Sequence, residues 1–223
     1  LPLLKKEVLV DAIDLRGVKA NTGNLIEGME IKGTLGKLYA KADRIDLGKE
    51  IARLNKIDLS DTAITLLMND TTTNKDTTST AVNWKLMLDQ IDLDRVAFAM
   101  QIPGDSLRLS TYIDKAGLTD GIVDLGSARY SASQFLLSGS SLSYDGSYSD
   151  PAPGFDPAHI ALNDVNIRID SLLYGGRDIS ARIKKFSAND RSGLTLSSLT
   201  GDISSDSTTI QVPGLLLKTP YSE

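Results

Sequence analysis

Apolar and polar residues alternate along most of this chain in the pattern of β-strands. Apolar residues stand at every second position in segment after segment, which places them on one face of an extended strand. Helical spacing is rare, since only residues 48–54 could form one or two helical turns, and their place in an internal repeat favours a strand. The chain is therefore predicted to be all-β. The clearest alternating runs are Val82/Trp84/Leu86/Leu88, Val96/Phe98/Met100, Leu107/Leu109/Thr111/Ile113, Val165/Ile167/Ile169, Ile179/Ala181/Ile183 and Leu194/Leu196.

The alternation slips by one residue at several points, for example between Leu15 and Val18 and between Leu93 and Val96. We expect turns or bulges that link short strands at these points. A sheet with one apolar face must cover that face with another layer or with a ligand, and no convincing amphipathic helix is present to do so. Two architectures remain: repeated antiparallel β-meanders that form a curved β-groove (a half-pipe), or an elongated sandwich with an apolar interior.

The chain also contains an internal repeat. Residues 13–15 (Ile-Asp-Leu) recur at 91–93, and residues 45–48 (Ile-Asp-Leu-Gly) recur as Val-Asp-Leu-Gly at 123–126, so both offsets are 78 residues. We predict one elongated β-repeat domain over residues 1–223, with units at about 8–68, 82–144 and 158–217, the third being the most degenerate. Polar or Pro/Gly-rich linkers are expected at 69–80 and 145–157. Stacked units with like faces favour the groove, because they make one continuous apolar stripe.

Composition and charge exclude several classes of function. The chain has 24 basic and 29 acidic residues, a net charge of −5 and no run of Lys or Arg, which argues against a nucleic-acid partner. It has no cysteine, so disulfides and thiolate metal sites are excluded. Aromatic residues make up only 5% of a chain that is 41% hydrophobic, so the apolar surface is mainly aliphatic. The chain begins at Leu1 and soon alternates, which we interpret as a piece of a longer protein.

Residues suited to catalysis are few. His159 is the only histidine and lies in the Pro-rich linker, and no Gly-x-Ser-x-Gly motif is present. Residues 28–34 have the glycines of a phosphate loop but lack its lysine, and they alternate like a strand. The single histidine and the missing motif argue against a catalytic triad through His159. We predict that the chain is not an enzyme, with no catalytic residue and no cofactor.

Five aspartates occupy matching places in the Ile-Asp-Leu-type tripeptides. Calcium requires six or more oxygen ligands gathered in a loop, whereas these aspartates each stand between two residues of the apolar face. We therefore predict solvent-facing carboxylates, which also discourage edge-to-edge aggregation, and no metal site. The five residues are Asp14, Asp46, Asp58, Asp92 and Asp124.

A family resemblance rests on three features: the Ile-Asp-Leu strand starts, the meander at residues 31–36 (Ile-Lys-Gly-Thr-Leu-Gly), and the stretch from Phe155 to Ile167. Together they resemble proteins of the TamB/AsmA type, in particular TamB of the Bacteroidetes. The resemblance implies a periplasmic rod of the cell envelope, anchored in the inner membrane by segments outside this chain. It also implies lipid transport along a β-groove between the inner and outer membranes, and an outer-membrane barrel assembly protein as partner.

On this interpretation the apolar residues of the strands contact phospholipid acyl chains, although ordinary core packing would explain the same residues equally well. Two rival functions remain. A surface adhesin or carbohydrate-binding β-sandwich would need more aromatic residues than are present, and an enzyme accessory domain or degenerate parallel β-helix would need clustered carboxylates. The predicted lining residues are Val96, Phe98, Leu107, Leu109, Ile113, Leu125, Leu137, Ile167, Ile169 and Leu196.

Overall fold

The computed structural model describes residues 7–8, 11–23, 28–68, 83–175, 178–205 and 208–222. Twelve strands and one 3-10 turn, η1 (Pro103–Asp105), make up the regular structure of these residues, which confirms the all-β prediction. The strands are β1 (Glu7–Val8), β2 (Ala12–Asn21), β3 (Met29–Asp46), β4 (Ile51–Met68), β5 (Lys85–Ile102), β6 (Leu107–Asp124), β7 (Arg129–Asp145), β8 (His159–Gly175), β9 (Asp178–Asp190), β10 (Thr195–Ser205), β11 (Ile210–Gln211) and β12 (Leu216–Lys218).

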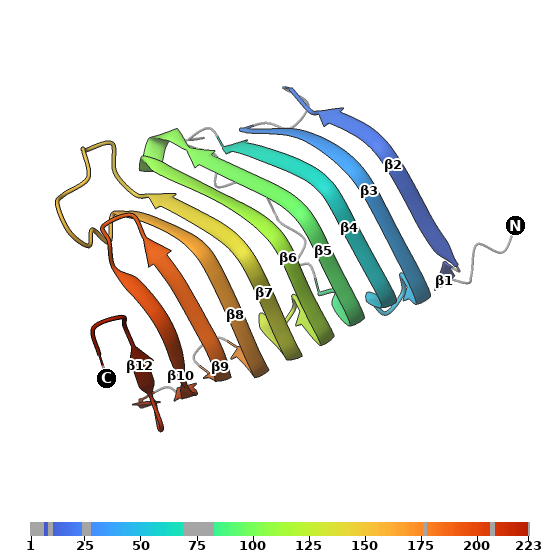
Figure 1. The fold of residues 1–223 in the computed structure, drawn as a ribbon. Helices are drawn as coiled ribbons and strands as arrows, with labels where there is room; N and C mark the ends of the chain where they lie inside the picture. The colour runs from blue at the N-terminus through green and yellow to red at the C-terminus, as the bar shows by residue number, and fades with distance from the viewer. Residues whose placement is uncertain are drawn as a thin grey trace, which may run out of the picture.

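All twelve strands belong to one open sheet. The order is β1-β3-β4-β5-β6-β7-β8-β9-β10-β11, with β2 paired to β3 and β12 paired to β10. Figure 1 shows that the long strands are bent along their length, so the sheet has the form of a half-pipe whose axis runs across the strands. Of the two predicted architectures, the curved β-groove is the one observed.

The strands are much longer than expected. Strands β3 to β6 each contain 18 residues, which corresponds to a length of about 60 Å at 3.3 Å per residue. The expectation of short strands is therefore wrong, because slips such as the one between Leu93 and Val96 lie inside a continuous strand. Residues 47–50 form a turn and β4 begins at Ile51, so the segment considered for a short helix is a turn followed by a strand.

Strand direction follows a three-strand pattern. Neighbouring strands are antiparallel except β4 and β5, which are parallel. Strands β3 and β6 begin 78 residues apart, at 29 and 107, and so do β4 and β7, at 51 and 129. Each unit has three strands, β2 to β4 in the first and β5 to β7 in the second. If β4 and β5 were antiparallel, the strands of the second unit would run opposite to those of the first. The parallel pairing of β4 and β5 gives corresponding strands the same direction. Strand β8 is antiparallel to β7, so the strands of the third unit run in the reverse directions.

Backbone bulges explain why the alternation slips inside continuous strands. Asp61 and Arg95 have φ values of 51° and 53°, in the left-handed region, and each is an extra residue between two side chains on the same face. The two residues lie at the same level of neighbouring strands, so the register does not shift there, and we use the word bulge for such a residue. A bulge of this kind bends the strand. Because one residue is added to the alternation, the side chain that follows the bulge projects from the apolar face again. The slips therefore let a strand curve without moving its apolar side chains to the outer face. Similar residues are Gly17, Asp120, Gly139, Asp164 and Ser171.

Side-chain contacts join the bulges of β4 and β5 at the parallel junction. The Arg95 guanidinium donates two hydrogen bonds to the Asp61 carboxylate, at 2.7 and 3.1 Å, and this contact holds the pKa of Asp61 below its ordinary value. One bulge further along, Asn55 Nδ2 donates to Asp89 Oδ2 at 3.0 Å. The two strands therefore change face at the same levels, which keeps their apolar side chains opposite each other.

The bulge at Asp61 gives a test of this arrangement. A Cβ on Gly36 would lie 2.5 Å from the Asp61 carbonyl oxygen, so Gly36→Ala forces backbone atoms apart. We expect this change to lower the free energy of unfolding by about 1–3 kcal/mol, measured by urea denaturation. Gly117→Ala is the control, because its Cβ would meet nothing closer than 3.8 Å. Equal stability of the two variants would contradict the role given to the bulge.

Candidate functional site

One row of apolar side chains crosses the whole sheet at its middle. Each member is the direct cross-strand partner of the next, and cross-strand partners project from the same face. The row contains one residue from each of ten strands and no polar residue. Its members are Leu15, Leu38, Leu59, Leu93, Ala116, Leu137, Ile167, Phe186, Leu199 and Leu217.

A second row lies beside the first on the same face, and both rows belong to what we call the apolar face. The second row is also continuous through the sheet, with a glycine only at its last strand. It contains Ile13, Ala40, Ile57, Ile91, Leu118, Phe135, Ile169, Ile183 and Gly201.

The apolar face is the concave face of the half-pipe. In a single-layered sheet, side chains become crowded only on the side toward which the sheet curves. All six buried apolar residues of the described chain lie on the apolar face, to either side of the two rows just named. These residues are Ala52, Leu88, Val96, Ala132, Val165 and Ala188.

The apolar face is open rather than covered by a second layer. The chain has an accessible surface of 14577 Å², whereas a compact protein of 24.0 kDa would expose about 9,900 Å². All strands of the described residues belong to the same sheet, so none of them packs on top of it. Edge-strand residues Ile13, Leu15 and Val18 are exposed as a result.

Very few polar atoms are available on the apolar face. The hydroxyls of Thr62, Thr111 and Ser140 donate to backbone carbonyls at 3.0, 2.8 and 3.1 Å. Among residues in register with the apolar rows there is no Lys, Arg or Glu, and the one aspartate is Asp190, opposite Leu162. Burial raises the pKa of Asp190, but hydrogen bonds from Ser192 and the amide of Ala161 outweigh this and keep the pKa below its ordinary value.

A hollow of about 250 Å³ lies in the apolar face near the β2 edge. Ala20 and Gly33 are cross-strand partners, and their small size leaves space between larger neighbours. Apart from Thr34 and Thr62, its lining is hydrocarbon or glycine, so it offers no charged group to a guest molecule. The lining residues are Val18, Ala20, Ile31, Gly33, Thr34, Leu35, Thr62 and Ile64.

The predicted lining residues lie on one face. Nine of the ten are in strands and project from the apolar face, where Leu137 and Ile167 are direct partners and Val96 faces Ile113. Leu125 lies in the turn after β6 and is 40% exposed. Leu38, Leu59 and Leu199 are also central to the apolar face and were missed, because alternation alone does not show which strands stand in register.

The five matching aspartates make different kinds of contact. Asp14 pairs with Arg16 at 2.8 Å, Asp58 with Lys56 at 3.2 Å, and Asp92 accepts from Gln90 at 2.6 Å. Asp46 and Asp124 instead accept backbone N–H groups of the turns that follow them. Asp46 is buried, so the prediction that all five face solvent is wrong for this residue.

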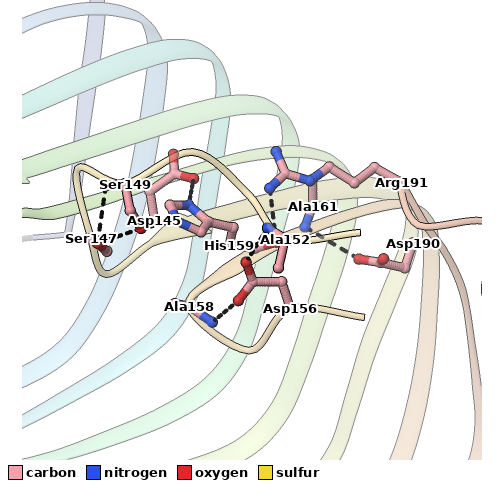
Figure 2. A network of polar contacts seen from close by, with 10 residues as sticks. All are labelled: Asp145, Ser147, Ser149, Ala152, Asp156, Ala158, His159, Ala161, Asp190 and Arg191. Atoms are coloured by element: carbon pink, nitrogen blue, oxygen red, sulfur yellow. Dashed lines mark hydrogen bonds and ion pairs between the residues drawn. The ribbon is translucent and has the colours of Figure 1, made fainter. Parts of the chain in front are cut away.

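A polar network holds the loop 146–158 at the ends of β7 and β8 (Figure 2). His159 is only 4% exposed, and its Nδ1 lies 3.0 Å from Asp145 Oδ1 while its Nε2 lies 3.4 Å from Ser149 Oγ. The Arg191 guanidinium donates to the His159 carbonyl oxygen at 3.1 Å. His159 and Asp145 are cross-strand partners one position away from the apolar pair Tyr144 and Ile160, so they project from the convex face.

Ser149, His159 and Asp145 have the side chains of a nucleophilic triad. As in such a triad, the histidine lies between the serine and the aspartate and contacts both. Ser149 Oγ also lies 2.8 Å from Ser147 Oγ, and its backbone amide donates to that same oxygen, so these contacts fix the loop. The hollow nearest Asp145, about 170 Å³ and lined by Arg108 among others, does not include Ser149. The prediction that the chain is not an enzyme stays a prediction.

No family model of known proteins matches the chain, and no curated protein matches it. Among the described residues there is no group of His, Cys, Asp or Glu arranged to hold a metal ion. Within the same residues, no helix has the length and apolar character required to cross a membrane.

The Asp156 carboxylate predicts a pH dependence of the loop. It accepts hydrogen bonds from the amides of Ala152 and Ala158, at 2.8 and 2.9 Å, and these contacts lower its pKa. A lowered carboxyl pKa means that the contacts stabilise the loop at neutral pH and are lost as the pH falls through that lowered value. We expect hydrogen exchange at Ala152 and Ala158 to accelerate, relative to the sheet, only under strongly acidic conditions.

Asp156→Asn is the matched variant for this experiment. It should exchange faster than the unmodified protein at neutral pH, and its protection should not change further on acidification. Identical pH profiles for the two proteins would remove Asp156 as the anchor of the loop.

Proposed function

We propose that this chain is a segment of a cell-envelope protein that carries lipid acyl chains along its apolar face. In this proposal the full-length protein is a TamB/AsmA-like bridge in the periplasm, anchored in the inner membrane through other segments. It moves lipid between the inner and outer membranes and supports outer-membrane assembly with a barrel partner. One observation carries the proposal: an apolar face without Lys, Arg or Glu that continues over ten strands and has no covering layer.

The energetic benefit of such a face to a lipid is large. Exposing an acyl chain to water costs about 0.8 kcal/mol per methylene, so a long tail faces a barrier of roughly 10 kcal/mol when it leaves a bilayer. Contact with the apolar face removes much of that exposure. The concave shape adds to this, because side chains approach the tail from the two walls as well as from the floor of the half-pipe.

The chemistry of the apolar face suits sliding rather than tight binding. Leu, Ile and Val present similar hydrocarbon surfaces at each strand, so a tail displaced by one strand meets nearly the same surface. The hydroxyls of Thr62, Thr111 and Ser140 donate to the backbone and do not anchor the guest. We therefore infer a conduit with little preference for one position or for one acyl chain.

A carbohydrate-binding or adhesin module is the second candidate, and one observation favours it. Loop 146–158 exposes Tyr148 and Phe155 by 60% and 57%, and such rings are suited to stacking on sugars. Tyr148 is nevertheless engaged, since the Arg108 guanidinium lies 5.3 Å from its ring centre and its hydroxyl donates to the Pro103 carbonyl. The open sheet also differs from the sandwich expected of such a module.

Extraction of the purified protein separates these two candidates. We expect phospholipid to be recovered in at least stoichiometric amounts when the protein is extracted with organic solvent and analysed by mass spectrometry, because the exposed hydrocarbon face retains tails. A lipid-free protein that binds glycans on an array would instead support the carbohydrate-binding module and overturn the lipid proposal.

Charged substitutions test the path of the acyl chain. Leu109→Asp or Ile167→Asp places a carboxylate on the apolar face, so we expect lipid crosslinking at a nearby photoreactive residue to be lost. Strand content by circular dichroism should remain close to that of the unmodified protein. Ser110→Asp is the control, since Ser110 is exposed on the opposite face of the same strand. Unchanged crosslinking in the Leu109 and Ile167 variants would remove both residues from the path.

A further inference from the structure

Aromatic residues of different kinds occupy different parts of the apolar face. Phe135 and Phe186 lie in the two central apolar rows. Trp84 directly precedes β5, Tyr130 is the second residue of β7, and Tyr174 is the last but one of β8. These three residues therefore stand at one margin of the half-pipe, where β6 and β8 end and β7 and β9 begin (Figure 1).

Cross-strand contacts connect the three residues along this margin. The Leu125 amide donates to the Trp84 carbonyl oxygen at 2.9 Å, which sets Trp84 opposite Leu125. Tyr130 faces Val123 on one side and Tyr174 on the other, and the two tyrosine rings lie 5.9 Å apart. We call Trp84, Tyr130 and Tyr174 the aromatic margin.

The hydrocarbon surface continues past the last paired residues at this margin. Leu47 and Leu125 lie 78 residues apart, at equivalent places in two units, and are 48% and 40% exposed. Each follows an aspartate, Asp46 or Asp124, whose carboxylate accepts backbone N–H groups and fixes the turn. Both units therefore hold an exposed leucine at the margin by the same turn geometry.

The type of aromatic residue indicates what kind of guest the half-pipe suits. Trp and Tyr combine an apolar ring with one polar group, and they favour the level at which hydrocarbon meets water or headgroups. Phe has no polar group and is suited to hydrocarbon alone. Tyr144 holds a similar place near the opposite end of β7. The order from margin to floor therefore matches an amphiphile better than a wholly apolar guest.

We propose that the aromatic margin marks the level of the lipid headgroup, with the acyl chains directed toward Phe135 and Phe186. This inference rests on the proposed function, because it assigns an orientation to the lipid carried there. The indole N–H of Trp84 and the hydroxyls of Tyr130 and Tyr174 would face the glycerol and ester groups, while the tails occupy the central rows.

Trp84 is the only tryptophan, so its fluorescence reports on this margin alone. The full chain is loaded with phosphatidylcholine that carries bromine either close to the acyl carbonyl or near the terminal methyl. Bromine quenches indole fluorescence only at short range. We expect the lipid brominated near the carbonyl to quench Trp84 several-fold more strongly than the lipid brominated near the methyl end.

A relocated tryptophan provides the control. Trp84→Phe combined with Phe135→Trp moves the single indole into the second apolar row, and the order of quenching should reverse; Phe186→Trp replaces Phe135→Trp if strand content falls. Equal or reversed quenching of Trp84, with lipid present in the extract, would overturn the orientation alone. Absence of lipid from the extract, with no quenching in either protein, would overturn the proposed function as well.

Discussion

The register between neighbouring strands is the constraint on which the rest of this structure depends. Successive side chains of a regular strand point to opposite faces. If the apolar pattern of an 18-residue strand slips by one residue and the backbone stays regular, the apolar side chains beyond the slip therefore point to the opposite face. The slips at Gly17, Asp61 and Arg95 coincide with bulges, and the bulges of neighbouring strands lie at matching levels, as with Asp61 and Arg95. The strands can therefore bend and still keep the two central apolar rows continuous.

Curvature replaces a second layer in this fold. A flat sheet of this size would leave one apolar face fully exposed to water, whereas the bent sheet crowds Leu88, Val96 and Val165 until they are buried. The remaining hydrocarbon is still exposed, and this exposure is the observation from which we propose a lipid guest. The side of the sheet that carries ion pairs such as Arg182 with Asp202 is the convex side, and Asp190 is the one charged residue in register with the apolar rows on the concave side.

The repeat and the strand directions are linked by simple geometry. Three antiparallel strands end in the direction in which they began, so a parallel neighbour is needed if the next unit is to superimpose on the last by translation. The junction between β4 and β5 meets this need, and it is also where Arg95 and Asn55 make side-chain bonds to Asp61 and Asp89. The junction between β7 and β8 is antiparallel, and the unit that follows it matches the others least in sequence.

The sequence by itself determined the strand content, the two-sided character of the sheet and the 78-residue repeat, because alternation and periodicity are local properties. It also identified residues such as Val96, Leu137 and Ile167 as members of one apolar surface. Only the tertiary structure decided which strands stand in register, that the slips are bulges within long strands, and that the apolar face stays open. The buried position of His159 and Asp46 likewise depends on a folded loop and a turn. These are long-range properties. A slip of one residue has the same sequence pattern whether the chain makes a turn there or continues as one strand. Pairing with neighbouring strands decides between the turn and the continuous strand.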